Sequence, residues 1–181
     1  MLSSLKTASL LLCVLLLLTG VLYPAFITLI AQTFFSDKAN GSLVQNAQGQ
    51  VIGSHLIGQF VNQKTYFWSR PSATVEKPYN AQISSGSNLG PSNPKLLEIV
   101  KQRVTQLHIL DSNNPQLIPI DLVTASASGL DPDISVQAAF YQVPRIARLR
   151  HLRVNQVNDL VRQYSQPRQW YFFGEPRVNV L

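Results

Sequence analysis

The chain has 181 residues, of which 45% are hydrophobic and 13% charged, and its formal net charge is +6. This length suits one modest globular domain with a hydrophobic core and argues against two full domains. The charges are unevenly distributed, because none occurs between Lys6 and Asp37. The N-terminal segment is therefore a different kind of structure from the rest of the chain.

A predominantly apolar stretch runs from about residue 10 to residue 35. Roughly 20 helical residues cross a hydrocarbon core of about 30 Å, and this stretch is longer than that. The alternative is a cleavable signal peptide, but its apolar region has about 7–15 residues and ends in a small-residue cleavage pattern, which is missing here. The sequence predicts an uncleaved transmembrane helix, in which Pro24 is a site where the helix can kink.

A short N-terminal tail normally stays in the cytoplasm while the domain that follows is exported. We therefore expect a tail and transmembrane helix over residues 1–36 and one extracytoplasmic domain over residues 37–181. That domain contains no cysteine, so no disulfide stabilises it. Nucleic acid is not an expected partner, because an exported domain does not meet it.

The exported domain is predicted to mix helices and strands. Hydrophobic periodicity and turn residues give, in chain order, strands at 43–46 and 50–53, an aromatic core segment at 66–68, one long loop at 75–94, a helix from 95 to about 110, a strand at 117–123, a helix from 132 to about 141, a basic helix at 145–153, a helix at 155–164 and a strand at 177–181. Asn93–Pro94 and Asp131–Pro132 are typical N-cap and first-position pairs, and Pro144 is expected to start or kink a helix. The fold class is α+β (mixed α/β), with one transmembrane helix followed by a single globular domain.

Catalytic and metal-binding patterns are not found. The three histidines are scattered, and none has a second ligand-type residue at metal-site spacing. Ser84, Ser85 and Ser87 are candidate nucleophiles, but no G-x-S-x-G or S-x-x-K pattern contains them. The loop 84–94 is glycine-rich and precedes a helix, as phosphate-binding loops do, yet it lacks the Gly-Lys-Ser/Thr of a P-loop. We interpret it as a turn that ends in a helix cap.

Four arginines lie in the basic segment 145–153. They suit lipid phosphates or an acidic protein surface. A solvated helix face is the alternative, and the pattern does not decide between these interpretations.

Seven segments occur in a fixed order: GSHLIGQ at 53–59, FWSRPSA at 67–73, SGSNLGPSNP at 85–94, DLVTAS at 121–126, GLDP at 129–132, QVPRIAR at 142–148 and GEPRVNVL at 174–181. Together they resemble the C subunit of the bacterial Kdp potassium-transporting ATPase. Each segment alone is a weak signal, whereas seven in order are highly specific. Similar proteins usually have glycine at the position of Ala127 and histidine at that of Asp133, so no role of that histidine carries over.

The resemblance implies a non-catalytic subunit of a four-part pump in the bacterial inner membrane. Its partners are a potassium-translocating subunit (KdpA), a P-type ATPase subunit (KdpB) and a small single-span subunit (KdpF). The family is described as a catalytic chaperone that raises the ATP affinity of the ATPase subunit. No intrinsic cofactor is expected, and direct contact with ATP conflicts with an extracytoplasmic domain.

The family motifs supply candidates for partner contact and no catalytic or metal-binding residue. These candidates are Gly53, Ser54, Leu56, Gly58, Gln59, Arg70, Pro71, Ser85, Gly86, Ser87, Asn88, Leu89, Gly90, Pro91, Asp131, Pro132, Gln142, Pro144, Arg145, Arg148, Arg177 and Asn179. The alternative function is a membrane-anchored envelope enzyme or ligand-binding domain that uses the loop Ser84–Pro94.

Overall fold

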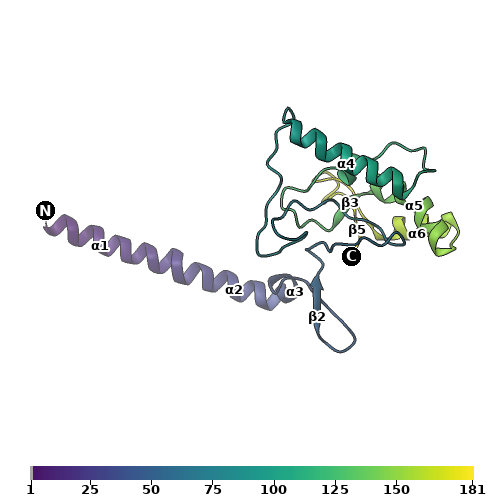
Figure 1. Cartoon of the computed structure of the whole chain (residues 1–181). Coiled ribbons are helices and arrows are strands. Elements are labelled where there is room, and N and C mark those ends of the chain that lie inside the picture. Colours follow the sequence, from purple (N-terminus) through teal and green to yellow (C-terminus); the bar gives the residue numbers. More distant parts are fainter. Residues whose placement is uncertain (1) are drawn as a thin grey trace. The chain divides into compact units, whose positions relative to one another are not determined.

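A computed structural model describes residues 2–181 (Figure 1). Internal contacts divide the chain into two compact units, the first ending at Ile52 and the second running from Gly53 to Leu181. The class is mixed helix and strand, as predicted.

The first unit is dominated by a long apolar helix. It consists of α1 (Leu2–Leu17), a π-helical turn η1 (Leu18–Leu22) and α2 (Tyr23–Phe34). The stretch Ser3–Phe34 has a hydropathy of 2.6 and is long and apolar enough to cross a membrane. This confirms the predicted apolar helix.

The π-helical turn lies just before Pro24. The N–H of Tyr23 donates to the carbonyl of Leu18, five residues earlier. Proline has no N–H to donate, and its ring crowds the carbonyl four residues back. A wider turn relieves that crowding while the helix continues, so the proline modifies the helix without ending it.

A short helix α3 (Ser36–Ala39) and a hairpin follow the long helix. The hairpin strands are β1 (Leu43–Gln45) and β2 (Val51–Ser54), within one residue of the predicted bounds. The Asn46 side-chain oxygen accepts the N–H groups of Gln48 and Gln50 at 3.0 and 2.9 Å, which closes the turn.

The second unit contains the remaining helices and a three-stranded sheet. Its elements are α4 (Pro94–Leu110), η2 (Ile120–Leu122), β3 (Asp133–Ser135), α5 (Val136–Arg150), α6 (Val154–Tyr164), β4 (Ser165–Gln166) and β5 (Arg177–Asn179). The strand order is β3-β5-β4, and both pairings are antiparallel. Val178 is opposite Ile134 on one side and Ser165 on the other, so the C-terminal strand is the centre of the sheet.

The helix α5 is the centre of the hydrophobic core. Its buried apolar residues are Ala138, Ala139, Tyr141, Val143, Ile146 and Ala147. Phe67 and Trp68 pack against this core, which confirms them as core aromatics, whereas Tyr66 is 48% exposed. Leu107 of α4, Val157 and Val161 of α6, and Ile134 and Val178 of the sheet complete much of this core, so helices supply most of its buried residues.

Three local predictions hold. α4 begins at Pro94, and the Asn93 side chain accepts the N–H of Lys95 at 2.9 Å, as an N-cap does. The helix predicted at 155–164 is α6, and the closing strand is β5.

The strand predicted at 117–123 is wrong. Within the described chain this segment is irregular up to the 3₁₀ turn η2, and Leu117 is 90% exposed. Pro119 has no N–H for a strand ladder. Asp121 instead binds the next element, because its carboxylate accepts the N–H of Ser135 at 2.7 Å.

The helix predicted to begin at Asp131–Pro132 is also wrong. Residues 133–135 form β3, and the N-cap of α5 is Ser135, whose hydroxyl accepts the N–H of Ala138 at 3.0 Å. The Asp131 carboxylate accepts the N–H of Asp133 and so closes a turn before the strand. Pro144 does not start a helix, because α5 runs through it.

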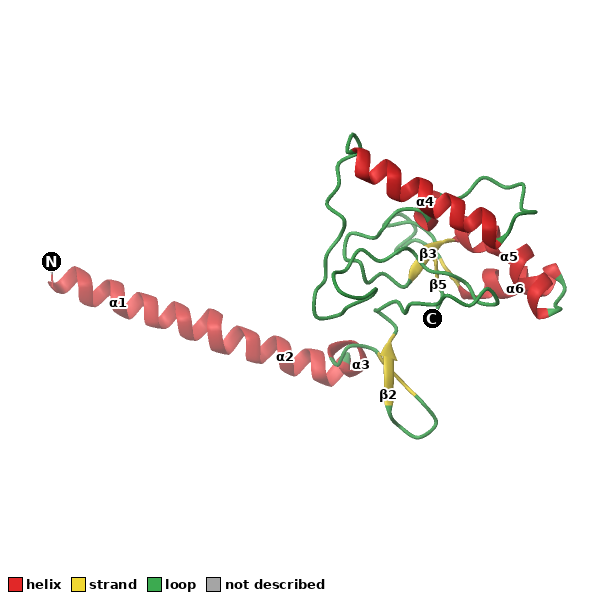
Figure 2. Ribbon diagram, viewed as in Figure 1, coloured by secondary structure: helices red, strands yellow, loops and turns green. Residues whose placement is uncertain are grey.

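The irregular region is longer than the predicted loop at 75–94. In the described chain no helix or strand lies between Ser54 and Pro94, and this stretch is drawn green in Figure 2. Loops therefore supply much of the second unit, and side-chain hydrogen bonds must take the place of a ladder.

Candidate functional site

Four segments of the second unit meet at what we call the motif junction, formed by residues 53–59, 84–86, 125–133 and 177–179. The N–H of Gly58 donates to the carbonyl of Leu130 at 2.7 Å. Ser84 donates its hydroxyl to the carbonyl of Ser128 at 3.1 Å. The side-chain amide of Asn179 donates to the carbonyl of His55 at 3.0 Å. Half of the predicted motif residues, 11 of 22, thus come together in these segments although they are far apart in the sequence.

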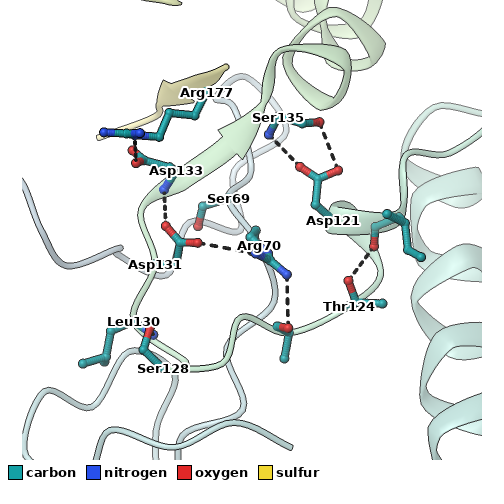
Figure 3. A network of polar contacts seen from close by, with 12 residues as sticks. Ser69, Arg70, Asp121, Thr124, Ser128, Leu130, Asp131, Asp133, Ser135 and Arg177 are labelled. Atoms are coloured by element: carbon teal, nitrogen blue, oxygen red, sulfur yellow. Dashed lines mark hydrogen bonds and ion pairs between the residues drawn. The ribbon is translucent and has the colours of Figure 1, made fainter. Parts of the chain in front are cut away.

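Two ion pairs cross the motif junction (Figure 3). Arg70 lies 3.5 Å from Asp131 and donates to the carbonyl of Ala125 at 3.2 Å. Arg177 pairs with Asp133 at 2.8 Å. Burial raises the pKa of the Asp133 carboxyl, and the nearby Arg177 opposes that rise. Asp133 therefore has its own cationic partner in this chain.

Two glycines allow the loops of the junction to touch. A Cβ on Gly86 would lie 2.8 Å from the carbonyl oxygen of Ala127. Gly129 has φ +68°, and a Cβ there would lie 2.5 Å from the carbonyl oxygen of Ser85. Real Cβ atoms do not approach backbone oxygens so closely, so both positions require glycine for packing.

The serine loop has the geometry of a turn. Within it, the Ser87 hydroxyl accepts the N–H of Leu89 at 3.5 Å, and Asn88 adopts a positive φ of 52°. Ser87, Asn88, Gly90 and Pro91 are exposed, whereas Ser85 and Gly86 are half-buried against the junction. Among the described residues no group of three or more His, Cys, Asp or Glu side chains could hold a metal ion. The serine loop therefore has an exposed tip at residues 87–91, and its first residues, Ser85 and Gly86, are held against the motif junction.

The motif residues of α5 form a second network. Arg145 is 1% exposed, donates from Nη1 to the carbonyls of Lys64 and Tyr66, and donates from Nη2 to Oε1 of Gln142 at 2.6 Å. Gln142 also exchanges two hydrogen bonds with the backbone of Trp68, at 2.8 and 3.0 Å. These two side chains bind the loop 64–68 to the central helix.

Two other arginines of the segment 145–153, Arg148 and Arg150, also contact protein groups. Arg148 pairs at 2.6 Å with Asp111, which is 3% exposed. Arg150 donates to the carbonyl of Thr65 at 2.7 Å and lies 4.6 Å from the ring centroid of Tyr66. Burial lowers the pKa of Arg145 to about 10, so its guanidinium is still charged at neutral pH. The arginine cluster mainly fixes loops, a role that the sequence did not indicate.

Two cavities flank Arg70. One, of about 510 Å³, lies between the loop 60–79 and α4 and is lined mainly by apolar side chains, including Phe60 and Leu107. The other, of about 480 Å³, lies within the motif junction and is lined by polar groups such as Asp131 and Asp133. Arg70 lines both, and its buried Nε has no hydrogen-bond partner within residues 2–181.

Sequence reasoning missed two central residues of this region. Ser72 donates its hydroxyl to the carbonyl of Gly129 at 2.7 Å and accepts the N–H of Tyr79 at 2.9 Å. The Tyr79 hydroxyl contacts Ser69 and the carbonyl of Arg70, and burial raises its pKa. Ser72 lies in a recognised motif segment, but Tyr79 stands in irregular sequence where no periodic pattern marks it.

Comparisons with known proteins show which family the chain resembles in sequence. Residues 5–181 match the family model KdpC, described as K+-transporting ATPase, c chain. The "Potassium-transporting ATPase KdpC subunit" of Methylococcus capsulatus is 53% identical over 181 residues, which cover 100% of this chain and 95% of that protein. Proteins of the same name from Polynucleobacter asymbioticus and Herpetosiphon aurantiacus are 56% and 57% identical over 164 residues, which cover 91% of this chain and 86% and 84% of theirs. The chain therefore belongs to the KdpC family, the c chain of K+-transporting ATPases.

Proposed function

We propose that this chain is a non-catalytic subunit of an ATP-driven potassium uptake pump and that it assembles and stabilises the pump. The observation that carries the proposal is family membership over nearly the whole chain, with relatives named as subunits of a potassium-transporting ATPase. The motif junction supports it, because its serines, glycines and ion pairs hold loops together and leave an exposed tip at residues 87–91.

The partners in this proposal are the potassium-translocating, ATPase and small single-span subunits of the same pump. The helix Ser3–Phe34 crosses the bacterial inner membrane once, with the N-terminus in the cytoplasm and residues 37–181 outside. The outer domain packs against the potassium-translocating subunit, and the helix packs against the membrane helices of its partners.

In this arrangement the chain raises the ATP affinity of the ATPase subunit without touching ATP. A domain outside the cytoplasm and a nucleotide site inside it interact only through a coupling free energy carried by the complex. The direct-contact version requires the domain to lie in the cytoplasm, so the topology decides between the two.

Copurification tests the assembly role and separates it from an enzyme or ligand-binding domain based on the serine loop. Replacing Ser84, Ser85 and Ser87 together with alanine should leave the chain copurifying with the other subunits, since only Ser84 bonds across the junction, and losing one such bond costs about 1 kcal/mol. Tagged wild-type chain is the control. Substrate turnover by the chain purified alone, lost in the triple variant, would overturn the proposal.

Thiol labelling tests the topology. In a Cys13→Ser background, the variant Ser92→Cys should react with a membrane-impermeant maleimide in intact spheroplasts, because Ser92 is exposed in the outer domain. The variant Ser4→Cys places an exposed thiol at the N-terminal end of the helix, before the apolar stretch that begins at about residue 10. It is the matched control and should react only after lysis. The reverse pattern would place the domain in the cytoplasm and restore direct ATP contact.

A further inference from the structure

The loop 168–175, which we call the aromatic loop, exposes four consecutive aromatic side chains. Trp170, Tyr171, Phe172 and Phe173 are 77%, 95%, 65% and 53% exposed, respectively. Neither the hydrophobic core nor its surrounding layer includes any of them. Large aromatic surface left in water is unfavourable, and such a contiguous patch is typical of a surface that contacts another apolar phase.

The aromatic loop is built to hold this exposed arrangement. Gln169 and Phe173 exchange two backbone hydrogen bonds of 2.9 Å, and Arg168 pairs with Glu175 at 2.7 Å across the base. Trp170 and Tyr171 adopt positive φ angles of 50° and 70°. This conformation is unfavourable for bulky side chains, so it persists only where the surroundings impose it, and such strain is often found at functional positions.

Lipid fits the aromatic loop better than a protein pocket does. The N–H groups of Gln169, Tyr171, Phe172 and Phe173 already donate to carbonyls within the loop, so the tip needs few polar partners from its surroundings. Tryptophan and tyrosine are enriched where a bilayer meets water, because their rings are apolar with one polar atom. Aromatic side chains are also enriched at protein–protein interfaces, so the test below includes a protein partner as one of its outcomes.

The chain also keeps this domain close to a bilayer if its apolar helix is a membrane anchor. Residues 35–52, which connect α2 to the second unit, reach at most about 60 Å even when fully extended. Residues 53–181 carry 13 Lys and Arg against 8 Asp and Glu, a formal net charge of +5 that suits anionic lipid. Tethering raises the local concentration of the aromatic loop at the membrane surface.

We propose that the aromatic loop inserts Trp170, Tyr171, Phe172 and Phe173 into the interface of the bilayer that the N-terminal helix crosses, as a second and reversible anchor. This inference rests on the proposed membrane anchoring. It assigns a membrane contact to a segment that the motif junction does not use.

Fluorescence quenching in lipid vesicles tests the proposal. The full-length chain is reconstituted into vesicles of phosphatidylethanolamine and phosphatidylglycerol, with and without phospholipids brominated near the head-group end of the acyl chain. The emission assigned to Trp170 is the difference between wild type and Trp170→Phe, since Trp68 is the other tryptophan and is held by its indole N–H on the carbonyl of Gln63. We expect about a twofold loss of that emission in brominated vesicles, because rings at the interface contact acyl chains.

A matched variant and a flotation assay make the outcome decisive. Phe172→Ser with Phe173→Ser should remove most of the quenching, whereas Leu117→Ser, at an even more exposed apolar position on another loop, should leave it unchanged. Flotation of the chain with vesicles but no quenching of Trp170 would overturn the loop proposal alone. Failure to float would overturn the membrane anchor and the loop proposal together. The same measurement is made on the pump complex in nanodiscs. If brominated lipid does not quench Trp170 there and iodide does not reach it either, the aromatic loop contacts a protein partner instead.

Discussion

Replacing Arg145 with alanine is expected to lower the free energy of unfolding by about 3 kcal/mol, because the change leaves buried acceptors without donors. The guanidinium donates to the carbonyls of Lys64 and Tyr66 and to Gln142, and it is 1% exposed. Denaturant unfolding of the full-length chain in detergent, followed by the emission of Trp68, measures the loss. Trp68 is a suitable probe because Arg145 lies 5.7 Å from its ring centroid.

Two further variants distinguish the buried hydrogen bonds of the Arg145 guanidinium from a general effect of losing a positive charge. Arg162→Ala removes an arginine that pairs with Asp159 at 3.9 Å, where both side chains are 73% exposed, and should change stability by less than about 0.5 kcal/mol. Arg145→Lys should unfold with a free energy between those of wild type and Arg145→Ala, because an ammonium group cannot reproduce the planar guanidinium with its several donors. Equal unfolding free energies for Arg145→Ala and Arg162→Ala would show that the network on α5 contributes nothing.

The role of Arg145 could not be read from the sequence. Four arginines in nine residues are typical of a charged surface, and the pattern gave no sign that one of them is buried. Its carbonyl partners lie about eighty residues earlier, in a segment without helix or strand. A hydrogen bond between a side chain and a distant loop backbone leaves no periodic signal, so only the three-dimensional arrangement reveals it.

Elements with strong local signals were predictable. The cap at Asn93 and the apolar spacing that follows fixed the start of α4, and the apolar length of residues 3–34 identified the long helix. The error at Asp131 has the opposite cause. An Asp-Pro pair suits a helix start and equally a turn before a strand, and pairing of β3 with the distant β5 decided for the strand.

The motif junction was predicted as a set of residues but not as a site. The family resemblance selected residues such as Gly58, Arg70 and Asn179, and it gave no information on what they contact. Contacts explain some of them, because Arg70 pairs with Asp131 and Asn179 bonds the carbonyl of His55. Ser87 to Pro91 have mainly local contacts, so the contacts within the domain do not explain why the family motif includes them.

Replacing Gly129 with alanine is expected to destabilise the second unit by about 3 kcal/mol or more, because a positive φ costs roughly 1–2 kcal/mol for a residue with a Cβ and the clash with a backbone oxygen adds to it. Gly129 has φ +68°, and its Cβ would lie 2.5 Å from the carbonyl oxygen of Ser85. The loop 84–86 would have to move away from the junction. Thermal unfolding of the full-length chain measures stability, and the yield of copurified complex measures whether the exposed tip keeps its place.

Two other glycines separate the conformational cost from the steric one. Gly174 lies in the same unit as Gly129 and has φ +74° with no atom within 4 Å of its Cβ position, so Gly174→Ala should show only the cost of the positive φ, about 1 kcal/mol. Gly90 has neither a positive φ nor a neighbour within 4 Å, so Gly90→Ala should be close to neutral. If all three variants unfold alike, close packing at the junction is not what requires glycine. If Gly129→Ala alone reduces both stability and copurification, the junction is the structure that presents the serine loop to the pump.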